Sequence, residues 1–180
     1  MSKLVDVRLE EVVFSPFQLV RFEWLVITAG DQSSFNSMTA CWGSFGHLWD
    51  EFHICTIYVR PTRHTFGFLE RHMRFSVQVF SERYKEQVLF LGRHSGRDVN
   101  KVEKIGLTPN FEYEDCMYYE EADLVFFCDK LYSQDIKPEL FSNHRARSWY
   151  QSNYPEHGHH RMYVGGIFRA MQRQRSEEEL

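Results

Sequence analysis

The chain consists of short runs of β-branched and aromatic residues, and no long helical segment separates one run from the next. Because parallel strands need long crossover connections, usually helices, this pattern disfavours a parallel α/β sheet. Seven or eight strands and three short helices are expected, which favours an antiparallel barrel with helices at its gaps. The 180 residues contain no internal repeat or linker, so one domain is predicted over 1–180, with a core of about 12–170 and a polar tail at 171–180.

Hydrophobic alternation and helix-capping residues place these elements along the chain. After an opening strand or extended arm over 1–15, strands are expected at residues 19–28, 38–42, 53–59, 75–80, 117–120, 122–131 and 162–167. Helices are expected at residues 66–72, 84–91, 99–105 and, as a helical turn, 145–153. Thr65 and Ser81 are expected to cap the first two helices, and Ser95 with Asp98 to form a capping box for the third. Gly106 is expected to end that third helix.

Charge and cysteine content limit the classes of function. The formal net charge of −4, from 21 Lys and Arg against 25 Asp and Glu, argues against a nucleic-acid binder. The four cysteines are widely spaced and form no C-x-x-C motif, which favours reduced thiols in a cytoplasmic protein. The chain has no run of 18 apolar residues and no apolar segment near its start, so neither a membrane span nor secretion is expected.

The stretch from Ser33 to Trp49 has an unusual composition for a strand or a helix. It combines hydroxyl side chains, the aromatic planes of Trp42 and Trp49, and two glycines, Gly43 and Gly46, that permit close backbone approach. A polar edge beside aromatic planes suits a flat heteroaromatic ligand. The alternative to a ligand site is that this stretch is only a twisted strand followed by a Gly-rich loop.

Two other segments combine hydroxyl groups and cations near an expected helix start. The run Arg60–Thr65 can bind an anion at a helix N-terminus, or it can be a solvated turn. The run Ser95–Asp98, with Lys101, can do the same, or it can be a capping box with an i, i+4 partner. The residues alone leave both pairs of alternatives open.

A histidine-rich run near the end of the chain raises the question of a metal site. His159 and His160 are adjacent, so in extended backbone they point to opposite faces, and His157 has no partner at a familiar ligand spacing. A surface loop is therefore favoured and no metal is expected, while one histidine beside a ligand remains open. The chain also lacks G-x-G-x-x-G, P-loop and G-x-S-x-G motifs, so a dedicated Rossmann site for a nicotinamide is not indicated, and any NAD(P)H would have to bind transiently.

Four segments together resemble a known family. Asn36–Gly43, Arg60–Thr65, Ser95–Asp98 and His160–Gly165 occur in the order and spacing of the flavin reductase-like, flavoredoxin-type proteins. The resemblance covers roughly residues 20–170. It implies a mainly β, antiparallel, Greek-key type of FMN-binding split barrel, and a homodimer with FMN near its interface.

The resemblance also implies roles for individual residues. The strand from Asn36 to Trp42 lines the isoalloxazine, with the backbone N–H groups of Met38 to Cys41 toward its N1, O2 and N5 edge. Arg60, Arg63 and Thr65, at the helix start, are the residues expected to bind the phosphate. Ser95 and Arg97 close over the ribityl chain or phosphate, and His160 lies near the flavin face where a nicotinamide stacks. The expected cofactor-binding residues are Asn36, Ser37, Met38, Thr39, Ala40, Cys41, Trp42, Arg60, Thr62, Arg63, Thr65, Ser95 and Arg97.

The function implied is an FMN-dependent oxidoreductase that passes electrons from NAD(P)H through FMN to a flavin, ferric or protein acceptor. One alternative is an FMN-binding electron carrier without its own NAD(P)H reaction. Another is a barrel of the same shape that binds haem or a pyridoxal phosphate relative. The sequence departs from the family pattern at two positions: Cys41 stands where the family commonly has Ser, and Gly166 where relatives often have Glu. Both differences weigh more against the reductase activity than against FMN binding.

Overall fold

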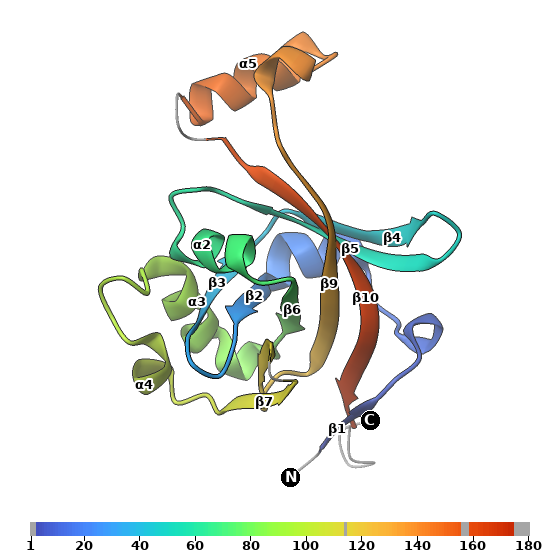
Figure 1. Cartoon of the computed structure of the whole chain (residues 1–180), viewed down its shortest axis with the longest axis vertical. Coiled ribbons are helices and arrows are strands. Elements are labelled where there is room, and N and C mark those ends of the chain that lie inside the picture. The colour runs from blue at the N-terminus through green and yellow to red at the C-terminus, as the bar shows by residue number, and fades with distance from the viewer. Residues whose placement is uncertain (1–2, 114, 156–158, 175–180) are drawn as a thin grey trace.

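The computed structural model describes residues 3–113, 115–155 and 159–174, and its main element is an eight-stranded antiparallel sheet (Figure 1). Seven strands follow the order β3-β2-β6-β9-β10-β5-β4, and β1 pairs with β10. The sheet strands are β1 (Leu4–Asp6), β2 (Leu25–Gly30), β3 (Phe35–Ala40), β4 (Gly43–Leu48), β5 (Phe52–Val59), β6 (Arg74–Val79), β9 (Leu124–Asp135) and β10 (Arg161–Arg173). A separate hairpin comprises β7 (Pro109–Tyr113) and β8 (Cys116–Tyr119).

Short helices fill the connections. They are α1 (Pro16–Gln18), α2 (His64–Arg71), α3 (Lys85–Arg93), α4 (Lys101–Ile105) and α5 (His144–Asn153), with the shorter turns η1 (Leu9–Glu11), η2 (Leu19–Glu23), η3 (Glu82–Tyr84) and η4 (Pro138–Leu140). The sheet curls, and its end strands β3 and β4 each pair on one side only (Figure 1). The predicted fold class, a mainly β antiparallel split barrel with short helices, is confirmed. In Figure 1, α5 projects from the barrel as an arm between β9 and β10.

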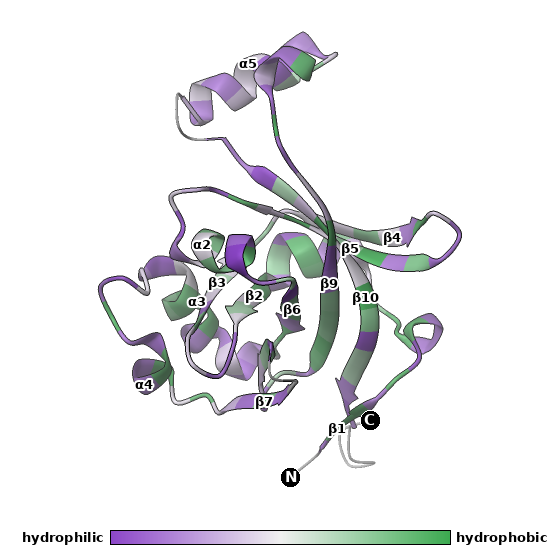
Figure 2. Ribbon diagram, in the orientation of Figure 1, coloured by the Kyte–Doolittle hydropathy of each residue, from purple (hydrophilic) through white to green (hydrophobic). Residues whose placement is uncertain are grey.

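Apolar side chains form two buried clusters on the two faces of the sheet. Figure 2 shows the corresponding hydrophobic colour along its central strands. Alternate residues of a strand point to opposite faces. Leu25 and Ile27 of β2 therefore join one cluster, which α2 covers with Phe68. Val26 joins the other cluster, which includes Leu91 of α3 and residues of α4 and β8. The two layers hold β3, at the end of the sheet, against α2 and α3.

The strand predicted at residues 19–28 begins later than expected. Residues 16–23 are helical in α1 and η2, and Pro16 at the first helical position favours this start. Trp24, with φ of 61°, ends the helical segment, and β2 begins at Leu25. The β-propensity of the segment was overridden because helical turns bury Leu19 and Val20 in the core.

The Gly-rich loop predicted after residue 42 was wrong, because Gly43–Leu48 forms β4 and pairs with β5. A Cβ atom at Gly43 would lie 2.7 Å from the carbonyl oxygen of Thr56, so this glycine permits close approach to β5 rather than to a ligand. Trp49 and Asp50 make the turn with positive φ values of 56° and 53°.

All three predicted helix caps were also wrong. Ser81 precedes η3 and its hydroxyl makes no capping hydrogen bond, and the N-cap position of α3 is Tyr84. α2 begins at His64 with Arg63 at the N-cap position, so Thr65 is the second helical residue. α4 begins at Lys101 with Asn100 at its N-cap position, and Ser95 and Asp98 form no capping box. The Ser95 hydroxyl instead accepts the N–H of Arg97 at 3.2 Å, a local turn that competes with helix initiation.

Strand number and strand length exceed the prediction. The described residues contain ten strands instead of seven or eight, and β10 extends from 161 to 173 where only 162–167 was expected. Among the strands missed is β4, which pairs with β5, whereas β1 at Leu4–Asp6 lies within the opening strand or arm expected over 1–15 and pairs with β10. Pro138 lies in η4 rather than in an irregular loop.

Gly106 ends α4 as predicted, in the left-handed conformation with φ of 65°. A Cβ atom added at Gly106 or at Gly46 would meet no described atom within 4 Å, but only Gly106 has a positive φ. Gly106→Ala is therefore expected to lower the free energy of unfolding by about 1 kcal/mol through backbone strain alone. Urea unfolding checks this, and Gly46→Ala, the matched control, is expected to change the value by less than about 0.5 kcal/mol.

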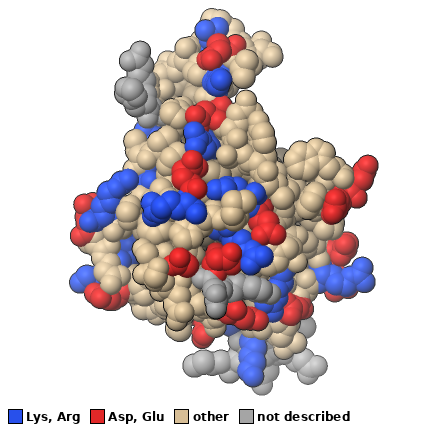
Figure 3. All heavy atoms as spheres, viewed as in Figure 1, with Lys and Arg blue, Asp and Glu red and all other residues tan. Residues whose placement is uncertain are grey.

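The surface shows no dominant charge. Lys and Arg side chains alternate with Asp and Glu over the face seen in Figure 3, as the formal net charge of −4 suggests. Among the described residues, no helix is both long enough and apolar enough to cross a membrane.

Candidate functional site

The open edge of β3 is where the sheet offers unpaired backbone groups. β3 pairs with β2 alone, so the backbone groups on its other side are not used by the sheet. Lys101 Nζ donates to the carbonyl oxygen of Ser37 at 2.8 Å, which shows that Ser37 presents its backbone polar groups away from β2. Because these directions alternate along an antiparallel strand, the N–H of Thr39 also faces away from β2.

A cavity of about 160 Å³ lies at the end of β3, and it is called here the β3-end cavity. Its lining consists of Met38, Thr39, Ala40, Cys41, Trp42, Tyr58, Arg60, Arg63, Tyr154 and His160. The lining comes from β3 and the residues after it, from the end of β5 and the turn that follows it, and from the segment between α5 and β10. Segments far apart in the sequence, each expected to contribute to one site, are thus brought together here.

Two arginines give one side of this cavity a positive charge. Arg60 follows β5, and its buried Nε has no hydrogen-bond partner among the described residues. Its guanidinium lies 5.3 Å from the ring centre of Tyr154, and its carbonyl oxygen accepts the N–H of Arg63 at 2.9 Å in the turn before α2. The N-terminus of α2 adds a positive partial charge. A buried, unpartnered N–H donor beside a second cation fits an anionic ligand.

His160 closes another side of the β3-end cavity and is 7% exposed. Its ring stacks on Trp42 with ring centres 4.6 Å apart, and the edge-on ring of Tyr154 lies at the same distance. Burial lowers the pKa of His160 to about 4, with the nearby charges of Arg60, His159 and Arg63 acting in the same direction. The ring is therefore a neutral hydrogen-bonding group at physiological pH.

His160 is accordingly expected to titrate near pH 4 in the folded protein. Histidine ring resonances followed by NMR from pH 8 to pH 3.5 measure this, and the spectrum of His160→Gln assigns the signal. Since the pKa in the fold lies below the ordinary value, the neutral ring stabilises the fold above about pH 6.5, and this contribution is lost as the pH falls toward 4. A midpoint at pH 6 or above would contradict the burial described here.

A second, more polar cavity of about 320 Å³ lies at the start of β3 and is called here the α4 cavity. Asn36, Ser37, Gly96, Arg97 and Lys101 contribute to its lining. Lys101 is 7% exposed and donates to the carbonyl oxygens of Ser37 and Leu91, both at 2.8 Å. Burial, with a smaller contribution from Arg63, lowers the pKa of Lys101 to about 8.

The comparison with known proteins decides the family. The flavin reductase like domain matches residues 21–180. The chain belongs to the flavin reductase-like family. Comparison with curated protein sequences finds no match.

Solved structures share the fold of this flavin reductase-like chain. An FMN-binding domain of a flavin reductase-like enzyme from Shewanella baltica is 16% identical, with a TM-score of 0.65 over 95% of this chain and 78% of that one. Flavoredoxin from Methanosarcina acetivorans is 16% identical, with a TM-score of 0.63 over 97% and 77% of the two chains. An NADH:FAD oxidoreductase of Streptomyces globisporus is 13% identical, with a TM-score of 0.62 over 84% and 78%.

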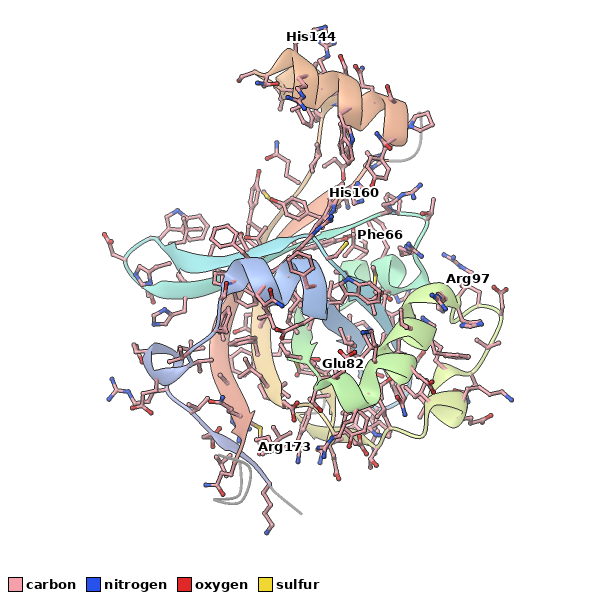
Figure 4. All side chains as sticks on the ribbon, turned by 180° about the vertical axis from the view of Figure 1, so that it is seen from behind. Phe66, Glu82, Arg97, His144, His160 and Arg173 are labelled. Atoms are coloured by element: carbon pink, nitrogen blue, oxygen red, sulfur yellow. The ribbon has the colours of Figure 1, made fainter. Side chains whose placement is uncertain are left out.

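The expected site residues of this flavin reductase-like chain fall into three groups. Met38 to Trp42, Arg60, Arg63 and His160 line the β3-end cavity. Asn36, Ser37 and Arg97 line the α4 cavity, and in Figure 4 Arg97 lies well apart from His160. Thr62, Thr65 and Ser95 are in neither lining.

The structure gives these last three residues other partners. Thr65 is fully buried, and its hydroxyl accepts the side-chain amide of Asn36 at 2.6 Å, so it joins α2 to β3. The carbonyl oxygen of exposed Thr62 accepts the Arg97 guanidinium at 3.1 Å, which joins the start of α2 to the segment after α3. An added Cβ at Gly96 would lie 2.0 Å from Asn36 Oδ1, so only glycine fits at position 96 in the segment after α3.

Four residues of the site were not predicted as members of it. Tyr58 and Tyr154 line the β3-end cavity, Tyr150 contacts His160, and Lys101 lines the α4 cavity. The sequence did point to Lys101, because this residue was considered together with Ser95–Asp98 as a possible i, i+4 partner. Nothing in the sequence distinguished the three tyrosines, because a chain with nine Tyr and sixteen Phe offers many equivalent aromatic residues.

The histidine-rich run shows no metal site within the described residues. His157 lies outside them. His159 Nε2 lies 3.6 Å from Asp135 Oδ1, and among the described residues no three His, Cys, Asp or Glu side chains come together to hold a metal ion.

Proposed function

We propose that this flavin reductase-like chain is an FMN-binding oxidoreductase that passes electrons from NAD(P)H through bound FMN to a flavin, ferric or protein acceptor. The observation that carries the proposal is the β3-end cavity, where the unpartnered Nε of Arg60 meets the open edge of β3 and aromatic planes. FMN combines an anionic phosphate with a flat ring system whose edge needs N–H donors, and the lining offers all three partners. The names of similar proteins, which include an FMN-binding domain and an NADH:FAD oxidoreductase, support the same class.

The protein's own residues bind and orient the cofactor. Arg60 and Arg63 hold the negative charge, and the N–H of Thr39 on the open edge of β3 donates to the ring edge. Neutral His160 and Trp42 close one side against water. FMN, when bound, supplies hydride and electron chemistry that side chains lack. Preorganised donors at the ring edge stabilise the charge that develops on reduction.

A second candidate is an FMN-binding electron carrier without its own NAD(P)H reaction. Two observations favour it. Gly166 is buried in β10, and an added Cβ would lie 2.9 Å from Leu131 Cδ1, so the carboxylate common in relatives would fit here only if the Leu131 side chain moved. His160 has one ring face stacked on Trp42, so a nicotinamide reaches that face only if Trp42 moves.

Spectroscopy separates these functions. The purified protein mixed with FMN is expected to quench FMN fluorescence and to give a protein-bound visible spectrum. Anaerobic titration with NADH and then NADPH is expected to bleach the bound flavin with at least one of them. Bleaching by dithionite but by neither nicotinamide identifies the electron carrier. Failure to bind FMN overturns both functions and leaves a barrel with another ligand, such as haem or a pyridoxal phosphate relative.

We also propose a homodimer with the FMN site near its interface, located in the cytoplasm. An apolar cavity of about 800 Å³ lies between the arm and the β3-end cavity, and Trp42, Tyr58, Phe141 and Trp149 are among its lining residues. Trp149 is 53% exposed, which supports burial by a second copy. Light scattering during gel filtration tests the dimer. All four cysteines are free thiols, which supports a reducing compartment.

A further inference from the structure

Tyr150 is the one buried residue of α5, and it joins the arm to His160. Its hydroxyl oxygen accepts the backbone N–H of His160 at 2.8 Å and lies 3.3 Å from the ring Nδ1 of the same residue. One phenol thus contacts both the backbone and the ring of a residue that lines the β3-end cavity.

The direction of the second hydrogen bond follows from proton counting. A phenol has one proton to donate, and its oxygen already accepts the N–H of His160. Burial raises the pKa of Tyr150, so the phenol keeps its proton at neutral pH. Nδ1 of His160 is the acceptor that the described residues offer to the Tyr150 O–H, so we infer that Tyr150 Oη–H donates to Nδ1. A neutral imidazole that accepts at Nδ1 carries its own proton on Nε2.

We propose that Tyr150 is a positioning residue that holds His160 as the tautomer protonated on Nε2, so that the β3-end cavity receives a fixed N–H donor. The link to FMN rests on the proposed function. In this role Tyr150 contacts no ligand, because it orients a group that does. The hydrogen bonds of Tyr150 also make the arm part of the site, because a displacement of α5 from the barrel would release the His160 ring.

The charged groups around the ring are consistent with a neutral, fixed tautomer. Arg60 and Arg63 face it from the segment between β5 and α2, and His159 is its neighbour in sequence; all three oppose a positive charge on the ring. Tyr154 contacts the ring edge-on, and Trp42 stacks on it. Among these contacts within the described residues, only Tyr150 makes a hydrogen bond to a ring nitrogen.

Long-range ¹H–¹⁵N correlation spectra of the full chain, recorded without added FMN at pH 7, report the tautomer directly. The wild-type spectrum is expected to show His160 protonated on Nε2, and Tyr150→Phe to show a mixture of both tautomers. Tyr132→Phe, which removes an exposed hydroxyl donating to Gln134, is the matched control and is expected to leave the His160 signals unchanged. A wild-type ring protonated on Nδ1 overturns the proposal even where Tyr150→Phe fails to fold, and so does a Tyr150→Phe spectrum identical to wild type.

FMN titrations test the consequence for binding. Tyr150→Phe is expected to raise the dissociation constant about threefold to tenfold, the range of one neutral hydrogen bond. In a His160→Gln background, whose amide N–H has no tautomers, the same substitution is expected to change it less than twofold. An equal effect in both backgrounds overturns the positioning role. If the wild-type protein binds no FMN, the proposed function fails, while the tautomer spectra still decide the assignment of Tyr150.

Discussion

Arg60→Ala is expected to weaken FMN binding by about 1.5–3 kcal/mol, a loss of roughly tenfold to more than a hundredfold in affinity. Arg60 lines the β3-end cavity, and its buried Nε has no hydrogen-bond partner among the described residues. A bound phosphate supplies the missing acceptor in a charge-assisted hydrogen bond. Because the donor is already desolvated, the ligand gains this bond without the cost of burying it.

Fluorescence titration of FMN at fixed ionic strength measures the effect of Arg60→Ala. Arg93→Ala is the matched control, since it removes an exposed cation at the end of α3 that lines neither cavity. It is expected to leave the dissociation constant unchanged and to report any long-range effect of net charge. Equal affinities of wild type and Arg60→Ala remove Arg60 from the site, and a similar loss in both variants assigns the effect to bulk electrostatics.

The fold could be predicted where local pattern and tertiary environment agree. The run at residues 53–59 is rich in β-branched residues, and it forms β5 within one residue of the prediction. Gly106 ends α4 because its left-handed conformation is a property of glycine itself. At residues 19–23 the β-propensity was real, but the helical turn buries Leu19 and Val20 more effectively. Tertiary packing decided that segment, and no local pattern records it.

The candidate site could be predicted at the level of segments but not of contacts. Residues from β3, from the turn before α2 and from the start of β10 do meet in one cavity. Thr65, however, is buried in the core, where its hydroxyl accepts a hydrogen bond from Asn36. The helix was expected to begin at residue 66 but begins at His64, which changes the direction of the Thr65 side chain. A shift of two residues turns a helical side chain to another face. Contacts made by the arm, such as that of Tyr150 with His160, depend on how the chain folds back between β9 and β10, and no local sequence pattern predicts this.

Lys101→Met is expected to lower the free energy of unfolding by about 1–3 kcal/mol at pH 7. The substitution leaves two buried carbonyl oxygens, on Ser37 and Leu91, without the donor that now lies 2.8 Å from each. Removal of a buried ammonium group offsets part of this loss, because the charge itself is costly to desolvate. The Ser37 carbonyl lies on the open edge of β3, so the variant is also expected to loosen the strand that leads into the β3-end cavity.

The pH dependence of this effect has a definite sign. The pKa of Lys101 is lowered to about 8 in the fold, below its ordinary value of 10.5, so between these pH values the unfolded chain binds more protons than the folded one. Wild-type stability gains from Lys101 as the pH rises through this window, whereas Lys101→Met gains nothing there. The difference between the two proteins is expected to widen by about 2–3 kcal/mol from pH 7 to pH 10. Urea unfolding at both pH values measures it, with Lys104→Met, an exposed lysine of the same helix, as the control that shows no widening. A difference that is constant with pH shows that the pKa of Lys101 is not lowered in the fold, and contradicts the desolvation of its ammonium group.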